Sequence, residues 1–373
     1  MRKIDILFIM PNLNRGGAEG VIVNIANSLS RESFRVEFLL FQKSGDLIYN
    51  LKDDIKLYSI ESPTVLKGIP KALKLIYRLN PDILFSGISN LNLYLSASIP
   101  ILKRLRGDIK FIARQPSILS LNNRQEKLPK VYESLHKSIY RNCDLVICQS
   151  IFMREDLIRN YNFPPNRSVV INNPIDIERV KELSLEYREY PFSKKSINLI
   201  SVGNLRYEKR FDLLLKAFAL LDSRYTLTII GDGAKREELE ELSIELNIKD
   251  RVALLGYQKN PYPYIKEADI YIITSEYEGF PNAILEANLL GLFTIGFKSV
   301  GGVTEIIKNG INGYLVEFGD IELLVKAIKE VNIGELDREA ISRSVNRFSI
   351  PKIIGHYEKY LKGLVYEKDS NLQ

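Results

Sequence analysis

The chain has 373 residues, 45% of them apolar and 26% charged, which is typical of a soluble globular protein and too long for one ordinary core. No run of about 18 apolar residues occurs, which excludes a transmembrane helix of the usual kind. The net charge of +6 is uneven: residues 1–190 carry 28 basic and 20 acidic side chains, and the remainder carries 24 and 26.

The first expected elements are a strand and a glycine-containing loop. The apolar run Ile4–Met10 predicts a buried strand, and it is too short to be a signal peptide. Residues 19–29 have the pattern of a helix. Between them, Gly16 and Gly17 allow the backbone to approach a ligand closely, at the carboxyl end of a strand where ligands gather in parallel sheets. The alternative is a tight turn that needs glycine only for its shape.

Strands and helices continue to alternate, which favours parallel sheets. Two cysteines, Cys143 and Cys148, flank and enter one apolar run, and we interpret them as reduced core residues rather than a disulfide or a metal pair. With no signal peptide expected, they indicate a cytoplasmic protein. The further strands expected in the first half are Val36–Phe41, Ile83–Ser86, Lys110–Ala113, Leu145–Cys148 and Ser168–Ile171.

An apolar stretch followed by a basic cluster lies in the same half. Leu91–Leu102 is apolar apart from a few polar interruptions, and residues 101–141 then carry ten basic side chains against three acidic ones. This pattern fits docking on an anionic membrane surface, with the protein peripheral at the inner face of the cell membrane. It fits a buried helix followed by a solvated loop equally well. Nucleic acid is not expected as a partner, because the basic block has few aromatic residues and no nucleic-acid-binding motif.

The second half repeats the alternating pattern. The charged, weakly patterned segment Ile177–Ser196 is expected to link two domains, and the tail Pro351–Leu364 is expected to be helical. Two Rossmann-like halves fit the whole series. The elements expected between linker and tail are Ile197–Val202, Asp212–Leu221, Thr226–Ile230, Arg236–Leu246, Val252–Leu255, Ile270–Thr274, Asn282–Leu290, Phe293–Gly296 and Glu322–Val331.

The most informative segment is residues 275–286, Ser-Glu-Tyr-Glu-Gly-Phe-Pro-Asn-Ala-Ile-Leu-Glu. Pro281 suits the first position of a helix, so Glu278 is expected in the loop before that helix and Glu286 about one turn inside it. The unpaired N–H groups of a helix start attract phosphate. A carboxylate is tolerated beside phosphate when an uncharged group such as a sugar hydroxyl separates them. Alternatively, Glu278 caps the helix and Glu286 is a solvated helical residue.

This segment resembles the Glu-x7-Glu signature of the retaining nucleotide-sugar glycosyltransferases of the GT-B fold, family 4 type. The resemblance spans nearly the whole chain and is strongest over residues 200–316. It implies an α/β protein with two Rossmann-like domains facing each other across a cleft. Residues 1–185, with the returning C-terminal helix 351–373, would form the acceptor-side domain, and residues 190–350 would bind the nucleotide sugar.

The resemblance also assigns roles around the helix start. In the family, the first Glu lies at the transferred sugar and the second holds the ribose of the nucleotide, which gives these roles to Glu278 and Glu286. The backbone between them touches the sugar and the phosphates. The corresponding positions in this chain are Gly279, Phe280, Pro281 and Asn282.

Other loops take donor-binding roles by the same resemblance. Gly16 and Gly17 would touch the donor phosphate, and Lys209 would meet the diphosphate as a point charge. Asn204 stands where the family has an Arg, and Arg206 is a candidate to supply the missing charge. The pocket for the nucleotide base would be lined by Gly231, Gly256 and Tyr257.

The glycines after residue 229 also suggest a dinucleotide fingerprint, but that fingerprint is incomplete. Arg236 occupies the place of its third glycine, and no acidic residue follows the next strand to hold a ribose. A dehydrogenase is therefore not favoured. Residues 301–305 are expected to shape the phosphate pocket, and residues 309–313 to form a turn beside the core.

In the first domain, many relatives carry a His after a strand such as Phe111–Ala113, where this chain has Arg114 and Gln115. The resemblance makes these two residues the candidate acceptor or sugar contacts. The only histidines, His136 and His356, lie on charged, helical-looking stretches and are expected at the surface.

The sequence requires no metal ion and no cofactor. It contains no Asp-x-Asp pair and no Cys/His cluster suited to zinc. Positive charge from Lys209, Arg206 and helix N-termini would take the place of a divalent ion.

The expected function is that of a retaining glycosyltransferase, with Glu278 and Lys209 as its candidate catalytic residues. The donor would be a UDP-linked hexose or N-acetylhexosamine. The acceptor would be a lipid-linked saccharide in the assembly of bacterial surface polysaccharide, such as lipopolysaccharide or capsule, or of oligosaccharide. One alternative is a noncatalytic nucleotide-sugar-binding subunit, which Asn204 and the absent histidine allow. Another is a nucleotide-sugar epimerase on the same fold, which would need no acceptor.

Overall fold

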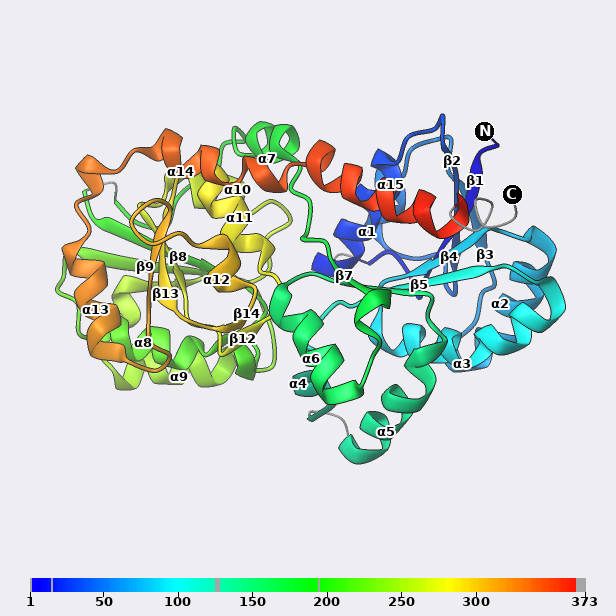
Figure 1. Cartoon of the computed structure of the whole chain (residues 1–373). Coiled ribbons are helices and arrows are strands. Elements are labelled where there is room, and N and C mark those ends of the chain that lie inside the picture. Colours follow the sequence, from blue (N-terminus) through cyan, green and yellow to red (C-terminus); the bar gives the residue numbers. More distant parts are fainter. Residues whose placement is uncertain (1, 15, 125–127, 194, 367–373) are drawn as a thin grey trace. The chain divides into compact units, whose positions relative to one another are not determined.

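Two parallel β-sheets, each flanked by helices, organise the chain in the computed structural model, which describes residues 2–14, 16–124, 128–193 and 195–366 (Figure 1). They belong to two units. Unit 1 comprises Met1–Pro174 and Ile350–Gln373, and unit 2 comprises Ile175–Ser349. The fold is therefore the α/β fold of two Rossmann-like domains that the GT-B resemblance implied.

Unit 1 contains a seven-stranded sheet in the order β3-β2-β1-β4-β5-β6-β7. Its central strands are buried along almost their whole length, so both faces of the sheet must be covered by helices. The strands are β1 (Ile4–Met10), β2 (Phe34–Leu40), β3 (Lys56–Ser59), β4 (Ile83–Ser86), β5 (Lys110–Arg114), β6 (Leu145–Cys148) and β7 (Ser168–Val170).

Helices cover both faces of this sheet, with α1 and α15 on one side and α2 and α3 on the other (Figure 1). The C-terminal helix α15 buries Ile353, Ile354, Tyr357 and Leu361, a spacing that forms one apolar helix face. The helices of unit 1 are α1 (Gly17–Ser28), α2 (Val65–Leu79), α3 (Ser89–Arg106), α4 (Leu119–Arg124), α5 (Pro129–Ile139), α6 (Ile151–Tyr161) and α15 (Ile350–Tyr366).

Unit 2 repeats this plan with a six-stranded sheet in the order β10-β9-β8-β11-β13-β15. A separate short pair, β12 (Tyr277–Glu278) and β14 (Val300–Gly301), lies outside the main sheet. The main strands are β8 (Ile197–Val202), β9 (Tyr225–Ile230), β10 (Val252–Leu254), β11 (Ile270–Ile273), β13 (Phe293–Phe297) and β15 (Gly313–Val316).

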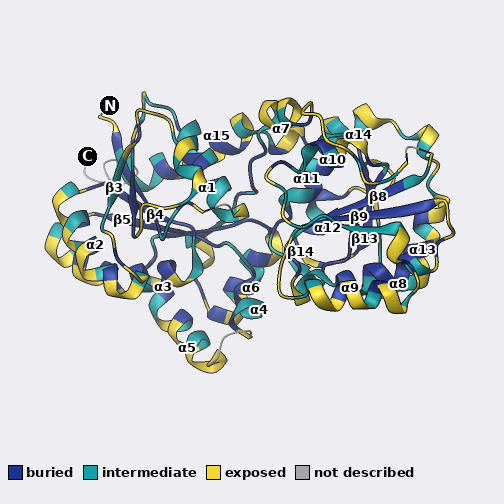
Figure 2. Ribbon diagram, turned by 180° about the vertical axis from the view of Figure 1, so that it is seen from behind, coloured by how far each residue is buried: buried dark blue, intermediate teal, exposed yellow. Residues whose placement is uncertain are grey.

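Some of the helices of unit 2 pack around one apolar core that includes Leu214, Phe218, Leu239, Leu324 and Ile328. Most residues of the central strands of this sheet are buried, and they are dark blue in Figure 2. The helices are α7 (Ile177–Leu183), α8 (Phe211–Ala219), α9 (Arg236–Glu245), α10 (Tyr262–Glu267), α11 (Asn282–Leu289), α12 (Val303–Ile306), α13 (Ile321–Glu330) and α14 (Arg338–Ser344).

Each sheet has a point where the strand order reverses direction. It lies between β1 and β4 in unit 1 and between β8 and β11 in unit 2. In open parallel sheets, ligands bind outside the carboxyl ends of the strands at such a point. The loops that follow β8 and β11 are therefore the first place to look for a ligand site in unit 2.

The two ends of unit 2 lie side by side. The backbone N–H of Ile175 donates to the carbonyl oxygen of Phe348 over 2.8 Å, and Ile175 forms an isolated parallel bridge with Ser349. Because residues from 350 onward return to unit 1, unit 2 is topologically an insertion between residues 174 and 350.

The structure corrects the expected linker. Residues 177–196 were expected to connect two domains, yet this segment begins with helix α7, which is part of unit 2 and packs on α10. Asp176 caps α7 by accepting from the backbone N–H of Arg179 over 3.1 Å, so the charged segment has a local reason to be helical. The sequence did not predict strands β3, β12, β14 and β15 or helices α2, α4, α6, α7, α10, α12 and α14.

The apolar stretch Leu91–Leu102 forms most of helix α3, and Leu91, Leu95, Ile99 and Leu102 are all buried. These buried side chains give the stretch a packing role in unit 1, and its docking on a membrane stays a prediction. No helix in the described ranges is both long and apolar enough to cross a bilayer.

The prediction for His136 was wrong, whereas that for His356 is confirmed. His356 is exposed on α15, but His136 is buried on α5, where its Nδ1 lies 2.8 Å from the carbonyl oxygen of Tyr132. Its ring packs against those of Tyr140 and Tyr161. Burial lowers the pKa of His136, so the ring is an apolar packing element at neutral pH.

The two cysteines are unpaired core residues, as predicted. Both are buried, and no disulfide joins them. Burial raises the pKa of Cys143 and of Cys148 to about 12. Neither thiol is therefore a nucleophile at neutral pH.

Candidate active site

An ion pair connects the two loops that flank the strand-order reversal of unit 2. Lys209 ends the loop after β8, and Glu278 lies in the loop after β11. The ammonium group of Lys209 donates to Oε1 of Glu278 over 2.6 Å, and both side chains are largely buried. A charged pair thus occupies the position where a parallel sheet of this order binds its ligand.

Further hydrogen bonds hold Glu278 in place. Its Oε1 also accepts from the hydroxyl of Ser275 over 2.7 Å. Its backbone belongs to β12, whose partner is β14, and its carbonyl oxygen accepts from the N–H of Gly302 over 3.0 Å. The carboxylate is therefore fixed by its own loop, by Lys209 and by the segment after β13.

Close backbone packing explains the glycines of this region. A Cβ added to Gly302 would lie 2.6 Å from the carbonyl oxygen of Gly279 and 2.8 Å from the ring of Phe280. A side chain at position 302 would push the loop away from β14. Gly302 thereby fixes the approach of the chain into helix α11, and the role of residues 301–305 in a phosphate pocket stays a prediction.

Helix α11 begins at Asn282, as expected, and Pro281 takes the N-cap position, one residue before the predicted first position of the helix. Its first-turn N–H groups carry the partial positive charge of the helix dipole and point out of the helix start. Together with Lys209, they offer positive potential at one location, which suits a phosphate group.

Glu286 lies four residues into α11 and is partly buried. The hydroxyl of Tyr262 donates to its Oε1 over 3.3 Å. Desolvation by burial raises the pKa of Glu286 to about 7, and the hydrogen bond from Tyr262 offsets only part of this effect. Burial has removed water from around this carboxyl group, so hydroxyl groups of a ligand can replace that water as hydrogen-bond donors.

We expect the raised pKa of Glu286 to make unit 2 less stable as pH rises. Between about pH 4.5 and pH 7 the folded state keeps a proton that the unfolded chain has lost, so the free energy of unfolding falls across this range. The substitution Glu286→Gln removes the titrating carboxyl group, and with it this fall in the free energy of unfolding. Relative to wild type, the variant should gain on the order of 1–3 kcal/mol between about pH 5 and pH 8.

The test is chemical denaturation of both proteins at each pH. Glu322→Gln, an exposed change in α13 of the same unit, is the matched control and should show no such pH-dependent gain. A difference between Glu286→Gln and wild type that is constant with pH would contradict the assignment.

The loops after β8, β9 and β10 pack closely through their glycines. The N–H of Gly231 donates to the carbonyl oxygen of Gly256 over 2.9 Å. Gly231 has φ of 140°, and a Cβ there would overlap the carbonyl oxygen of Gly203. These glycines bring three strand ends together, while the side chain of Tyr257 remains exposed beside them.

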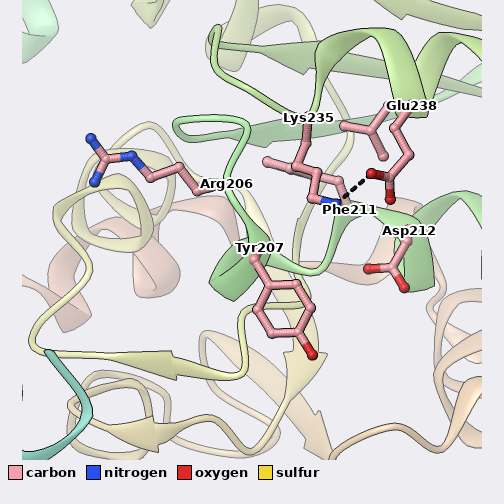
Figure 3. Close-up of a pocket in the computed structure, with 7 residues that line it drawn as sticks. Arg206, Tyr207, Phe211, Asp212, Lys235 and Glu238 are labelled. Atoms are coloured by element: carbon pink, nitrogen blue, oxygen red, sulfur yellow. Dashed lines mark hydrogen bonds and ion pairs between the residues drawn. The ribbon is translucent and has the colours of Figure 1, made fainter. Parts of the chain in front are cut away.

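Arg206 and Asn204 are exposed in the loop after β8. Arg206 lines a small pocket of about 70 Å³. In Figure 3 its guanidinium points away from the ion pair of Lys235 and Glu238 on the opposite side of this pocket. No ion pair between Arg206 and Glu278 is recorded among the described residues, and the contact of Arg206 with a donor stays a prediction. The pocket is lined by Arg206, Tyr207, Phe211, Asp212, Lys235, Glu238 and Leu239.

Gly16 and Gly17 lie in unit 1, after β1 and at the N-terminus of α1. A Cβ at Gly16 would overlap the carboxylate of Glu19, which folds back over the glycine. Burial raises the pKa of Glu19. Because the Glu19 side chain is flexible, it could move aside, and the contact of Gly16 and Gly17 with a donor phosphate stays a prediction.

Arg114 and Gln115 are both buried inside unit 1, and their contact with an acceptor or sugar stays a prediction. Nη2 of Arg114 donates to Oδ1 of Asn173. Oε1 of Gln115 accepts from the hydroxyl of Tyr140 over 2.8 Å. Their position at the end of β5 is the expected one, but it lies under neighbouring segments rather than at a surface.

Two residues of the site were not given a role from the sequence. Ser275 was inside the quoted segment, yet nothing in the spacing showed that its hydroxyl would reach Glu278. Tyr262 lies on another helix, 24 positions before Glu286, and no sequence pattern connects the two. In the described ranges, no group of three or more His, Cys, Asp or Glu side chains is arranged to hold a metal ion.

Comparison with known proteins gives two family matches and several full-length relatives. The model described as Glycosyltransferase Family 4 matches residues 15–179, and that described as Glycosyl transferases group 1 matches residues 185–348. One relative, from Campylobacter jejuni, is N-acetylgalactosamine-N,N'-diacetylbacillosaminyl-diphospho-undecaprenol 4-alpha-N-acetylgalactosaminyltransferase. It is 26% identical, over 97% of this chain and 100% of its own length.

Two further matches also extend over the whole chain. UDP-Gal:alpha-D-GlcNAc-diphosphoundecaprenol alpha-1,3-galactosyltransferase of Escherichia coli is 23% identical over 98% of each chain. The structure of Anabaena Alr3699/HepE in complex with UDP-glucose superposes with a TM-score of 0.76 at 20% identity, over 96% of this chain and 100% of that one. With the family matches and the doubly wound sheets, they show that this chain belongs to the family 4-type glycosyltransferases of the GT-B fold.

Proposed function

We propose that the protein transfers a hexose or N-acetylhexosamine from a UDP-sugar to a hydroxyl of a lipid-linked saccharide, with retention of the anomeric configuration. The observation that carries this proposal is the ion pair of Lys209 and Glu278 at the strand-order reversal of unit 2, beside the N-terminus of α11. It supplies positive charge for a diphosphate and negative charge for a sugar ring within one site.

A UDP-linked donor is supported by the relatives. The E. coli relative is named for UDP-Gal, and the Anabaena structure contains UDP-glucose. In this chain the uracil would lie against the glycine-packed ends of β8, β9 and β10, near Gly231, Gly256 and Tyr257. The ribose hydroxyls would donate to Glu286, whose desolvated carboxyl group gains hydrogen bonds on binding.

Charge develops at both ends of the breaking bond. As the bond between the anomeric carbon and the diphosphate oxygen lengthens, negative charge grows on the diphosphate and positive charge on the sugar ring. Lys209 and the first N–H groups of α11 stabilise the diphosphate, and Glu278 stabilises the ring and orients its hydroxyls. Preorganised charges of this kind cost no reorganisation when the bond breaks.

The acceptor attacks from the face that the diphosphate leaves, which preserves the configuration. The acceptor oxygen forms the new bond to the anomeric carbon, and its proton moves to the departing phosphate oxygen, so no separate base is needed. The reaction uses no metal ion and no cofactor in this proposal.

A lipid-linked acceptor is supported by the names of the relatives from C. jejuni and E. coli, both of which refer to a diphospho-undecaprenol-linked saccharide. This acceptor places the enzyme in the assembly of bacterial surface polysaccharide or oligosaccharide. It also requires a protein that works at the inner face of the cell membrane.

The proposal is tested by incubating the purified protein with a panel of UDP-sugars, with and without polyprenyl-diphosphate saccharide acceptors, in the presence of EDTA. We expect transfer from one UDP-sugar, a product with the anomeric configuration of the donor by NMR, and no loss of rate in EDTA. Inverted configuration or a requirement for metal would overturn the mechanism. Binding of UDP-sugar without turnover would favour a noncatalytic subunit, and conversion of the donor alone would favour an epimerase.

A further inference from the structure

Tyr262 and Glu286 form a hydrogen-bonded pair between two helices of unit 2. The hydroxyl of Tyr262 on α10 donates to Oε1 of Glu286 on α11 over 3.3 Å. No hydrogen bond to the second carboxylate oxygen, Oε2, is recorded within the described ranges. The pair therefore uses one oxygen of the carboxylate and leaves the other available to a ligand.

The backbone fixes the position of Tyr262. This residue stands between Pro261 and Pro263, whose rings restrict the chain on both sides. The buried side chain of Asn260 accepts from the backbone N–H of Tyr262 over 3.2 Å and donates to the carbonyl oxygen of Leu183 over 2.8 Å. Because Leu183 is the last residue of α7, helix α10 is tied to α7 as well as packed on α11 (Figure 1). The hydroxyl therefore reaches Glu286 from a rigid support.

The protonation state makes Tyr262 the donor of this bond. Burial, reinforced by the charge of Glu286, raises the pKa of Tyr262, so its hydroxyl keeps its proton at neutral pH. Three further ionisable side chains act on the pair. Arg179 and Asp176 of α7 have opposite effects on the pKa of Tyr262, and Tyr271 of β11 is affected by the charge of Glu286. In the described ranges, none of the three is recorded as a hydrogen-bond donor to the carboxylate.

A carboxylate held in this way can discriminate between ribose and deoxyribose. Ribose presents two neighbouring hydroxyl groups, and each can donate to a carboxylate oxygen. When one hydroxyl is missing, a desolvated acceptor stays unpaired, and the affinity falls by the whole cost of that unpaired group. The discrimination depends on a fixed orientation, because a freely rotating carboxylate would turn to the hydroxyl that remains.

We propose that Tyr262 is a positioning residue that directs the free oxygen of Glu286 toward the ribose, and that this pair selects ribonucleotide donors over their 2′-deoxy counterparts. The inference rests on the proposed function, in which Glu286 receives the ribose hydroxyls. In that scheme Tyr262 acts on the nucleotide and not on the bond that breaks. Its effect should therefore fall on donor affinity and KM rather than on kcat.

The test is calorimetry of the full chain with UDP and with 2′-deoxy-UDP at about pH 8, where most of Glu286 is ionised. Wild type should bind UDP about thirtyfold more tightly than 2′-deoxy-UDP, which is the effect of one hydrogen bond to a charged group. Tyr262→Phe keeps the ring but removes the donor, so the ratio should fall to about threefold, through weaker binding of UDP alone. In steady-state transfer by this variant, KM for the UDP-sugar should rise about tenfold.

Tyr264→Phe is the matched control, because it removes a hydroxyl from the same helix two positions later. Its ring packs on that of Tyr190, with 6.5 Å between the ring centroids. The control should keep the wild-type preference for UDP. An unchanged preference in Tyr262→Phe, or an equal loss in the control, would overturn the inference. Equal weakening of both nucleotides by Tyr262→Phe would also overturn it, because that result indicates a packing role alone.

A second measurement needs no nucleotide. The hydrogen bond from Tyr262 lowers the pKa of Glu286, so Tyr262→Phe should raise that pKa above its wild-type value of about 7, and Tyr264→Phe should leave it unchanged. The titration is followed by NMR of labelled Glu carboxyl carbons. An unchanged pKa of Glu286 in Tyr262→Phe would overturn the contact on which the inference stands.

Failure of the proposed function gives a different result from failure of this inference. Wild type that binds GDP or ADP more tightly than UDP, and whose preference over the matching 2′-deoxynucleotide is lost in Tyr262→Phe, would overturn the UDP-linked donor alone. Sugar transfer from a UDP-sugar by wild type, together with equal affinity for UDP and 2′-deoxy-UDP, would overturn the selection of ribose alone.

Discussion

Glu278→Gln is expected to lower kcat by roughly three orders of magnitude, because it removes the only formal negative charge that the proposal places at the sugar ring. The amide keeps the shape of the side chain and can still accept from the hydroxyl of Ser275. The fold should therefore persist, with a thermal midpoint close to that of wild type. UDP binding should change little, since Glu278 faces the sugar rather than the nucleotide in this scheme. The measurement is steady-state transfer together with UDP affinity by calorimetry.

The control for this variant is Glu276→Gln, two positions earlier in the same loop. Its carboxylate lies 3.9 Å from Arg210 rather than at Lys209, so its loss should leave kcat within a fewfold of wild type. Equal effects of the two substitutions would show that loop charge, and not the position of Glu278, matters. Wild-type turnover by Glu278→Gln would refute the catalytic assignment.

Lys209→Gln is expected to lower kcat about a hundredfold and to weaken UDP binding by roughly tenfold. The larger effect falls on kcat because charge on the diphosphate grows as the glycosidic bond breaks. Lys209 is also the partner of Glu278 over 2.6 Å, so its loss leaves a partly buried carboxylate unpaired. Lys216→Gln on α8 removes an exposed cation from the same unit and should have no effect on either quantity.

The double variant Lys209→Gln with Glu278→Gln tests whether the two charges act together. If they form one catalytic unit, the double variant should be scarcely slower than Glu278→Gln alone. Strictly multiplicative losses would mean that the ion pair is incidental and that the residues act on separate steps.

Much of the fold follows from short apolar runs. Ile4–Met10, Ile83–Ser86, Leu145–Cys148 and Ile197–Val202 are strands with the predicted bounds, because strands buried on both faces leave an unbroken apolar signal. Strand β3 was missed because it lies at a sheet edge and is only partly buried, so its residues carry no such run.

The site was predictable as a set of residues but not as a geometry. Lys209 and Glu278 are 69 positions apart, and the resemblance selected both, but only the strand order β8-β11 brings their loops together. The surroundings of Arg114 were not predictable for a related reason. Its position after a strand is typical of a ligand contact, yet its burial depends on Asn173 and on neighbouring segments far away in sequence. Charge alone likewise gave no sign that His136 would pack among tyrosines.

The adjoining ends of unit 2, at Ile175 and Ser349, have a consequence for biosynthesis. A ribosome releases the whole of unit 2 before it releases α15, which supplies four buried side chains to unit 1. The first 174 residues must therefore wait, with one flank uncovered, while a complete second sheet is translated and folds. Chaperone dependence should accordingly concentrate on the earlier half of the nascent chain. A stop codon near position 350 would remove α15 and so destabilise unit 1, which is translated first, rather than unit 2.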